Sequence, residues 1–311
     1  MQLQVTRIEQ RSALVKSFTL QTTDGLALPK FEPGAHVRVT IPSLNEPDPS
    51  RAYSLVSDPA DLTHYEIAVL LVEDGNGGSR YLHHEVRAGD LLEVTPPKNE
   101  FLYVRSAPHS ILIAGGIGIT PILSLCRDLA RAGGSFEVHY VGRGEQHMPY
   151  RENVKEICGG RAHIYSSRDE FDLPAILTGP QPETHVYACG PHSLLEATRA
   201  LAQSAGILRS NIHFESFGYR RLPADRPFEL ELRRSGVTVT VAPGRPLLEV
   251  IEGLGIWAPA ECRRGECAMC ITTILEGSGD HRDHCLGRED RATSICPCVS
   301  WSDSERLVLD I

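Results

Sequence analysis

The sequence lacks any apolar run that approaches the roughly 18 residues needed to span a membrane. Its first residues, MQLQVTRIEQ, lack the basic and then apolar pattern of a secretory signal. An excess of positive charge is also missing, because 40 acidic residues outnumber 31 lysines and arginines and the net charge is −9. Since phosphate binding needs a basic surface, no nucleic acid is expected as a partner. These absences predict a cytoplasmic protein without a membrane or nucleic-acid partner.

The sequence also lacks internal repeats and low-complexity tracts, and 311 residues predict two or three domains of about 100–150 residues each. What it does contain is nine cysteines, six of them within the last 50 residues. An odd number of cysteines without a secretory signal fits a reducing compartment better than a disulfide scaffold. The clustering near the end of the chain favours a metal site instead.

Composition divides the chain into three parts. Residues 1–103 alternate β-branched runs, such as VRVTI and YEIAVLLVE, with turn-rich stretches, which predicts a small barrel or sandwich. Residues 104–218 alternate strands with helices, which predicts a parallel sheet covered by helices. A polar, proline-bearing linker follows at 219–226. Residues 227–311 then contain a hairpin pattern, a short helix and the cysteine cluster.

In the second part, the apolar run SILIA leads into GGIGITP and then into a helical pattern that stops at Gly133. Thr120 suits the N-cap of this helix and Pro121 its first position. Glycines between a strand and a helix let the backbone approach a pyrophosphate. The motif reads G-G-x-G rather than G-x-G-x-x-G, so an ordinary strand–turn–helix junction remains an alternative.

The segment ECRRGECAMC has cysteines at the spacing C-x4-C-x2-C. They are Cys262, Cys267 and Cys270. With a distant fourth cysteine, this is the plant-type spacing for a [2Fe–2S] cluster held by four thiolates. Cys298 is the predicted fourth ligand, and Cys296 and Cys285 remain alternatives. Small residues, Gly265 and Ala268, would let backbone N–H groups approach the sulfurs. A structural zinc site is the main alternative, although zinc prefers C-x2-C pairs.

Other chemistry-bearing residues are assigned structural roles. Cys126 and Cys158 are predicted to be small buried side chains, the usual position of a free cysteine. The segment GDHRDH, residues 279–284, contains two histidines and two aspartates. We interpret it as a solvated turn rather than a second metal site.

The order of four motifs resembles the ferredoxin–NADP reductase superfamily. They are R-x-Y-S at 51–54, G-G-S at 77–79, G-G-x-G-x-T-P at 115–121 and C-G-P at 189–191. With an iron–sulfur segment at the end, the chain is similar to the reductase components of Rieske non-haem oxygenases of the phthalate dioxygenase reductase type. The resemblance covers essentially the whole chain, including PPKNEF, HFESF, DHRD and the closing RLVLDI. One departure is Leu70 and Leu71, where related chains often carry a basic residue before the G-G-S loop.

This resemblance implies an FMN-binding β-barrel domain (1–103), an α/β parallel-sheet NAD(H)-binding domain (104–218) and an α+β ferredoxin-like, β-grasp iron–sulfur domain (227–311). It assigns FMN to Arg51, Ala52, Tyr53, Ser54, Gly77, Gly78, Ser79, Thr120 and Phe217. It assigns NAD(H) to Gly115, Gly116, Gly118, Thr120, Cys189, Gly190 and Pro191. The cluster ligands would be Cys262, Cys267, Cys270 and Cys298.

The implied function is an NADH-dependent reductase that passes electrons through FMN and a [2Fe–2S] cluster to a Rieske-type oxygenase component. The cofactors carry the redox chemistry, so no side chain is assigned as a catalytic acid or base. A monomer is expected. Arg143 follows a predicted strand and could meet a 2′-phosphate, which leaves NADPH open. The alternatives are a stand-alone flavin reductase with another acceptor and a zinc-stabilised interaction module.

Overall fold

The computed structural model describes residues 1–42, 44, 49–73, 75, 77–179, 183–217, 222 and 224–311. It contains two compact units, Met1–Glu215 and Ser216–Ile311. Half of the predicted linker at 219–226, namely 219–221 and 223, lies outside the described residues. Among the helices of the described ranges, none combines the length and the apolar character that crossing a membrane requires.

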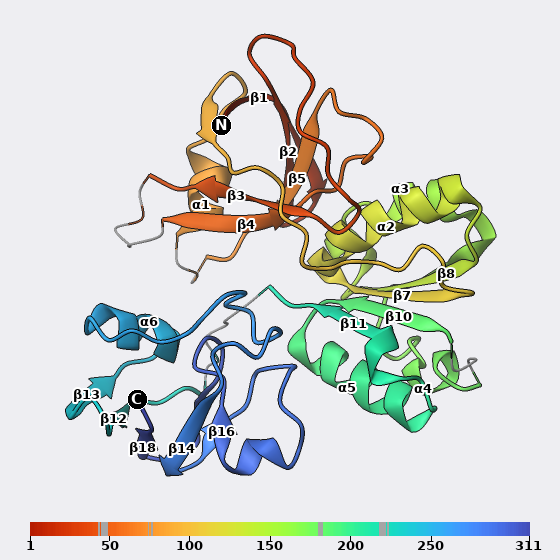
Figure 1. Ribbon diagram of the computed structural model, residues 1–311. Helices are drawn as coiled ribbons and strands as arrows, with labels where there is room; N and C mark the ends of the chain where they lie inside the picture. The colour runs from red at the N-terminus through yellow and green to blue at the C-terminus, as the bar shows by residue number, and fades with distance from the viewer. Residues whose placement is uncertain are drawn as a thin grey trace. The chain divides into compact units, whose positions relative to one another are not determined.

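A β-barrel forms the first part of the first unit (Figure 1). Its strands are β1 (Gln2–Ser12), β2 (Val15–Gln21), β3 (His36–Thr40), β4 (Ser50–Ser54), β5 (Tyr65–Leu70) and β6 (Leu91–Glu93), and helix α1 (Gly78–His84) follows β5. The antiparallel order β5-β2-β1-β6 is joined to the β3–β4 pair by bridges between Val39 and Val94 and between Leu55 and Ile67. Alternate residues of β3, Val37 and Val39, enter the barrel core, as do Leu3 and Val5 of β1. The barrel expected from the sequence is confirmed.

A parallel sheet forms the second part of this unit, in the order β11-β10-β7-β8-β9. The strands are β7 (Ser110–Gly115), β8 (Phe136–Val141), β9 (Ala162–Tyr165), β10 (His185–Cys189) and β11 (Ile212–Glu215). The helices are α2 (Ile119–Ala132), α3 (Arg151–Cys158), α4 (Leu173–Ile176) and α5 (His192–Ser204), with 3-10 turns η1 (Gly116–Gly118), η2 (Glu145–His147), η3 (Gly159–Arg161) and η4 (Arg209–Asn211). Figure 1 shows α2 and α3 on one face of the sheet and α4 and α5 on the other. The predicted α/β architecture is therefore confirmed.

Helix α2 begins earlier than the sequence predicts. Its first residue is Ile119 and its N-cap is Gly118, so Thr120 is not the cap. The turn η1 runs directly into the helix, and the Thr120 hydroxyl donates back to the Ile117 carbonyl oxygen at 3.0 Å. Pro121 is then the third helical residue, where its missing N–H leaves no helical bond unmade. The helix ends as predicted at Gly133, whose φ of 68° is the left-handed conformation that favours glycine.

The barrel and the parallel sheet share a hydrophobic core within the first unit. Val15 and Ala68 of the barrel pack in the same cluster as Leu125 of α2. At the edge of this core, the Tyr150 hydroxyl donates to Glu66 at 2.9 Å, and the Arg11 guanidinium lies 5.0 Å from the Tyr150 ring centre. These contacts fix the barrel against the sheet.

The second unit is built on a mixed sheet in the order β13-β12-β18-β14-β16. Its elements are β12 (Phe228–Leu232), β13 (Val237–Val241), α6 (Leu247–Gly253), β14 (Thr272–Glu276), β15 (Gly279–Asp280), η5 (Asp290–Ala292), β16 (Ser294–Ile295), β17 (Trp301–Ser302) and β18 (Arg306–Leu309). β12 and β13 form the predicted hairpin, and β12 runs parallel to β18. Leu247 and Ile251 of α6 join Leu230 and Leu307 in the core. The α+β, β-grasp arrangement is confirmed.

Candidate functional site

The candidate flavin site is built on β4 and the loop before α1. Arg51 and Tyr53 are two residues apart on β4, so both side chains point to the same face. Gly78 lies directly over them, because a Cβ at this glycine would come within 2.9 Å of Arg51 Cγ and 3.7 Å of the Tyr53 hydroxyl. The Ser79 hydroxyl is used within the loop, where it accepts from the Val72 amide at 3.1 Å. The R-x-Y-S and G-G-S segments, 22 residues apart in sequence, are therefore neighbours.

The candidate nucleotide site lies where β7 and β10 end. These adjacent parallel strands lead into G-G-x-G and C-G-P. A Cβ at Gly118 would lie 2.2 Å from the Cys189 carbonyl oxygen, and a Cβ at Gly115 would lie 2.7 Å from Pro191 Cδ. The strand order reverses between β7 and β10, which is the switch point at which open α/β sheets bind ligands. Only glycines allow the two loops to close on each other in this way.

Glu215 joins the two candidate sites, and sequence reasoning did not single it out. It is the last residue of β11 and the in-register partner of Cys189. Its carboxylate is buried, at 1 % exposure, and accepts a hydrogen bond from the Ser54 hydroxyl at 3.3 Å. The segment HFESF was noted only for its resemblance. Its position at the carboxyl end of a parallel strand is the signal that could have identified Glu215.

Two residues predicted to bind the flavin, Thr120 and Phe217, lie outside β4 and the loop before α1. Thr120 is buried in the first turn of α2 and bonds to the backbone through its hydroxyl. Phe217 lies at the beginning of the second unit and is half exposed. The assignment of either residue to the flavin stays a prediction.

The loop that contains Cys262, Cys267 and Cys270 turns its backbone amides toward a sulfur. The amides of Arg264 and Cys267 both donate to Cys262 Sγ at 3.4 Å. Positive φ angles at Arg263 (54°), Gly265 (73°) and Ala268 (64°) produce this winding. Two of these residues are not glycines and adopt a conformation that side chains disfavour, which is typical of functional loops. Such a concave set of N–H groups stabilises an anionic thiolate or cluster.

The distal cysteines lie close to Cys270 and to one another. Cys298 Sγ lies 3.3 Å from Cys270 Sγ, whereas Cys285 Sγ lies 3.2 Å from Cys296 Sγ. Hydrogen bonds from the Cys296 and Cys298 thiols hold the pKa of Cys270 far below its ordinary value. A lowered pKa favours the thiolate, the form that ligates metal. The donor set fits an all-thiolate iron–sulfur site, with Cys298 beside a predicted ligand.

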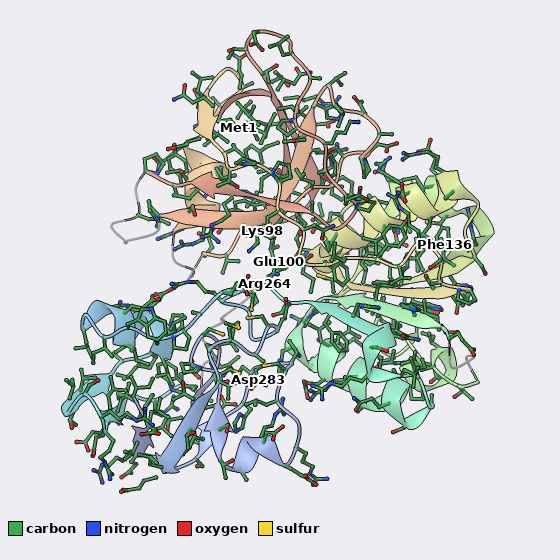
Figure 2. The ribbon with its side chains drawn as sticks, in the orientation of Figure 1. Met1, Lys98, Glu100, Phe136, Arg264 and Asp283 are labelled. Carbon is green, nitrogen blue, oxygen red and sulfur yellow. The ribbon has the colours of Figure 1, made fainter. Side chains whose placement is uncertain are left out.

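The interpretation of GDHRDH as a solvated turn is wrong. Asp283 is completely buried and His284 is 7 % exposed. Burial alone would raise the pKa of Asp283, but hydrogen bonds from His281 and the Leu286 amide keep this pKa below its ordinary value. The His284 amide donates to the Gly265 carbonyl oxygen at 2.8 Å, so this segment supports the cysteine loop. In Figure 2 the labels of Arg264 and Asp283 mark the region in which the cysteine sulfurs gather.

Comparison with known proteins matches both ends of the chain to described families. Residues 2–103 match the oxidoreductase FAD-binding domain, and residues 230–300 match the 2Fe-2S iron-sulfur cluster binding domain. The heme-dependent oxidative N-demethylase beta subunit of Ectopseudomonas mendocina is 38% identical over 99% of this chain and 98% of its own. The carnitine monooxygenase reductase subunit of Escherichia coli is 39% identical over 100% of this chain and 98% of its own.

A solved structure of phthalate dioxygenase reductase extends the likeness to three dimensions. It superposes with a TM-score of 0.76 at 33% identity, covering 100% of this chain and 98% of that one. That protein is described as a modular structure for electron transfer from pyridine nucleotides to [2Fe-2S]. The likeness therefore spans the barrel, the parallel sheet and the cysteine-bearing unit together. The chain is an oxidoreductase and belongs to the family of flavin- and [2Fe–2S]-containing oxygenase reductases that includes phthalate dioxygenase reductase.

Proposed function

We propose that this chain takes electrons from NADH and delivers them, through FMN and a [2Fe–2S] cluster, to a Rieske-type oxygenase component. The observation that carries the proposal is the contact between Ser54 of the barrel and Glu215 at the end of β11. It brings the flavin-binding strand β4 to the strand ends where the nucleotide loops meet. The same polypeptide then provides a cysteine loop whose amides point at a sulfur.

The side chains and backbone of this chain supply binding and orientation. When bound, a flavin accepts a hydride and gives up electrons singly, whereas a [2Fe–2S] cluster takes one electron at a time. Gly115 and Gly118 let the loops at the carboxyl ends of β7 and β10 pack against each other, and a dinucleotide would bind where these two loops meet. Ser54 is the last residue of β4 and Glu215 pairs with Cys189 at the end of β10, so their hydrogen bond would orient both groups at the place where the two rings would meet.

For the flavin, we infer FMN rather than FAD. Arg51 beside Gly78 offers a charged donor and a closely approachable backbone, a combination that suits one terminal phosphate. The test is acid extraction of the purified protein and chromatography of the released flavin against both standards. FMN at one equivalent per chain is the expected result. Recovery of FAD alone would contradict the inference.

For the nicotinamide donor, we infer NADH. Arg143 follows β8, where its exposed side chain is the cation that could meet a 2′-phosphate. The discriminating measurement compares kcat/KM for NADH and NADPH in the wild type and in Arg143→Ala. NADH preference should be retained in both proteins. If the wild type preferred NADPH and Arg143→Ala did not, Arg143 would be shown to bind the 2′-phosphate.

For the electron acceptor, we propose docking on the face next to the cysteine loop. Trp257 is 81 % exposed and Met269, which lies between two predicted ligands, is 53 % exposed. Together with Ile256 and Pro259 they line an open groove in the second unit. Exposed aromatic and methionine side chains are typical of the centre of protein interfaces. An acceptor bound here would lie close to the cluster ligands.

The overall function is tested by reconstitution. The purified protein should show flavin absorbance with added cluster absorbance, and NADH should bleach both. Adding a Rieske oxygenase component with its substrate should give NADH-dependent product. One relative is the beta subunit of a haem-dependent demethylase, so an oxygenase component that contains haem should be tested as a second electron acceptor for comparison. A colourless, zinc-containing protein would contradict the proposal outright.

A further inference from the structure

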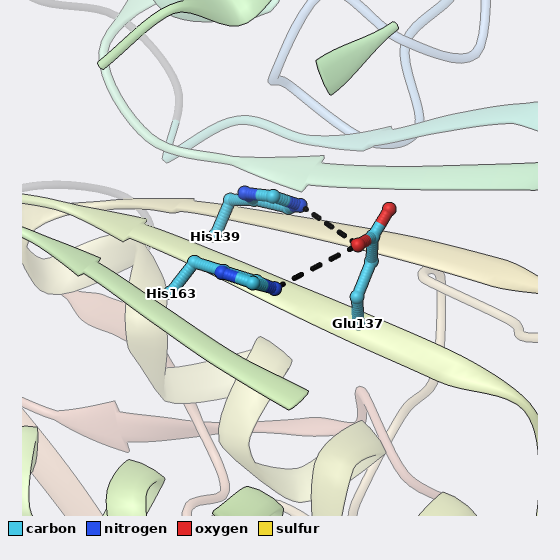
Figure 3. Close-up of side chains that lie close together, drawn as sticks. All are labelled: Glu137, His139 and His163. Atoms are coloured by element: carbon cyan, nitrogen blue, oxygen red, sulfur yellow. Dashed lines mark ion pairs between the residues drawn. The ribbon is translucent and has the colours of Figure 1, made fainter. Parts of the chain in front are cut away.

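Three side chains with metal-ligating atoms meet on the parallel sheet (Figure 3). Glu137 and His139 are two residues apart on β8, so their side chains point to the same face. His163 on the edge strand β9 is the in-register partner of His139. Neighbouring Ile111 and Ile113 pack with α5, so this face is the one that carries α4 and α5. The ligand atoms of the three residues all lie within 4.8 Å of one another.

The separations are close to those of a chelate. Glu137 Oε2 lies 3.5 Å from His139 Nε2 and 3.8 Å from His163 Nε2. Donors bound tetrahedrally at about 2.0–2.1 Å from one metal ion lie about 3.3–3.4 Å apart. The two imidazole rings are stacked, with centres 4.7 Å apart and planes at 12°. A shared ion would require the two rings to turn so that both Nε2 atoms point at one position beside Glu137, which Figure 3 shows in contact with both rings.

His139 provides independent evidence for a ligand. It is 5 % exposed, and its buried Nε2 makes no hydrogen bond of ordinary geometry among the described residues, since the Glu137 carboxylate that faces it lies 3.5 Å away. Its Nδ1 lies 3.0 Å from the Tyr165 hydroxyl. Metal-binding histidines are usually oriented by such a bond at the other ring nitrogen, which fixes the tautomer. A buried polar atom left unmatched costs free energy, and a cation at Nε2 would remove that cost.

We propose that Glu137, His139 and His163 bind a divalent transition-metal cation of the Zn²⁺ and Ni²⁺ class. Two imidazoles and one carboxylate suit these ions, whereas Mg²⁺ and Ca²⁺ prefer oxygen ligands throughout. His163 is exposed, so water can complete the coordination from the open side. His109 Nε2 lies 3.9 Å from the other oxygen of Glu137. The ion would fasten the edge strand β9 to β8, outside the electron-transfer path.

The experiment is calorimetric titration of the protein, with flavin and cluster in place, with NiCl₂. The wild type should bind one Ni²⁺ per chain at this site. His163→Ala and Glu137→Gln should each weaken Ni²⁺ binding at least about tenfold, and Tyr165→Phe by about tenfold through loss of orientation. His147→Ala, at an exposed histidine of η2, should bind Ni²⁺ like the wild type.

Hydrogen exchange provides a second measurement, which shows both that the variants fold and where Ni²⁺ binds. Ni²⁺ should slow hydrogen exchange of the β9 amides in the wild type and leave them unchanged in His163→Ala. Since His163 is exposed, its loss should not prevent folding, whereas replacement of buried His139 could. The proposal is overturned if the wild type shows no Ni²⁺ site by titration, or if His163→Ala binds Ni²⁺ as tightly as the wild type does.

Discussion

Gly118 packs against Cys189 so closely that a Cβ at Gly118 would lie 2.2 Å from the Cys189 carbonyl oxygen and 2.8 Å from the Gly190 nitrogen. Both obstacles are backbone atoms, so Gly118→Ala must separate the two loops at the carboxyl ends of β7 and β10. We expect KM for NADH to rise and stability to fall by roughly 1–3 kcal/mol, as for other overpacked sites. Steady-state kinetics and thermal denaturation measure the two effects.

A matched control for this change is Gly160→Ala. Gly160 has no neighbour within 4 Å of a built Cβ and no left-handed φ. Its replacement should leave KM and stability as they are in the wild type. If Gly118→Ala retained wild-type KM, the crevice between Gly118 and Cys189 would not be the nucleotide site.

The fourth cluster ligand is tested by three serine variants. Cys298 Sγ contacts Cys270 Sγ at 3.3 Å, whereas Cys296 contacts both Cys270 and, at 3.2 Å, Cys285. Cys298→Ser should therefore abolish the cluster absorbance and cytochrome c reduction while NADH still reduces the flavin. Cys296→Ser and Cys285→Ser should keep the cluster. Retention of the cluster in Cys298→Ser, together with its loss in Cys296→Ser, would reassign the ligand.

The buried ion pair between Asp225 and Arg282 makes a separate prediction about stability. Its side chains are 1% and 10% exposed, and Arg282 also contacts the Trp301 ring at 6.0 Å. Removing one partner of a buried pair leaves an uncompensated charge. Because Arg282 keeps Asp280 as a second partner, Asp225→Asn should destabilise this unit by about 2–3 kcal/mol.

Tryptophan fluorescence during urea denaturation measures this loss, because both tryptophans, Trp257 and Trp301, lie in the second unit. The comparison variant is Asp310→Asn, which breaks the pair with the exposed Arg234. Water screens an exposed pair, so this variant should lose little stability. Equal losses in the two variants would show that burial of Asp225 does not determine its contribution.

Much of this architecture could be predicted because local patterns determine it. The alternation of apolar runs predicted the barrel strands and the parallel sheet, and the x4-then-x2 spacing predicted the cysteine loop that winds around Cys262. Such signals depend on residues close together in sequence. They are read without knowledge of what packs against them.

The residues that were missed depend on tertiary contacts. Asp283 has the composition of a solvated turn, yet contacts from His281, Leu286 and Ser300 allow it to be buried under the cysteine loop. Glu215 can be buried because its carboxylate accepts a hydrogen bond from the Ser54 hydroxyl, which is distant in sequence. Thr120 lost the capping role because a 3-10 turn preceded the helix. The sequence of a short polar motif does not show whether its side chains will be exposed to solvent or buried against distant residues.

The histidines on β10 and β11 predict a pH dependence of stability. His213 stacks on Tyr187 with ring centres 4.4 Å apart, and burial followed by the nearby His185 lowers the pKa of His213 to about 4. The unfolded chain, with an ordinary pKa of about 6.5, takes up a proton in this range before the folded chain does. The stability that neutral His213 contributes to the folded state is therefore fully present above about pH 6.5 and is lost as the pH falls toward 4.

We expect the free energy of unfolding of the first unit to decrease by about 1–2 kcal/mol from pH 7.5 to pH 5.0 on account of His213, after allowance for its partial exposure. His213→Asn should remove this part of the pH dependence. Flavin fluorescence on release reports unfolding of the unit that carries the barrel. An identical pH dependence in the variant would exclude His213 as its source.

Trp257 tests where electrons leave the protein. Its side chain is 81 % exposed and lines the groove that also contains Met269, next to the predicted cluster ligands. An exposed tryptophan with no packing role in its own unit should be replaceable without loss of stability. If it is an anchor for the acceptor, Trp257→Ala should weaken acceptor binding at least about tenfold, as hot-spot tryptophans do. NADH reduction of the flavin and of the cluster, followed by stopped flow, should stay at wild-type rates.

The control for this variant is Leu26→Ala, which removes an apolar side chain of the barrel that is 66 % exposed. Product formation with the oxygenase component should be normal there and reduced in Trp257→Ala. Slower reduction of the cluster in Trp257→Ala would assign this side chain to transfer within the chain instead. Equal acceptor affinity in both variants would show that the acceptor does not dock at the groove. The centre of an interface should weaken when its largest apolar side chain is removed.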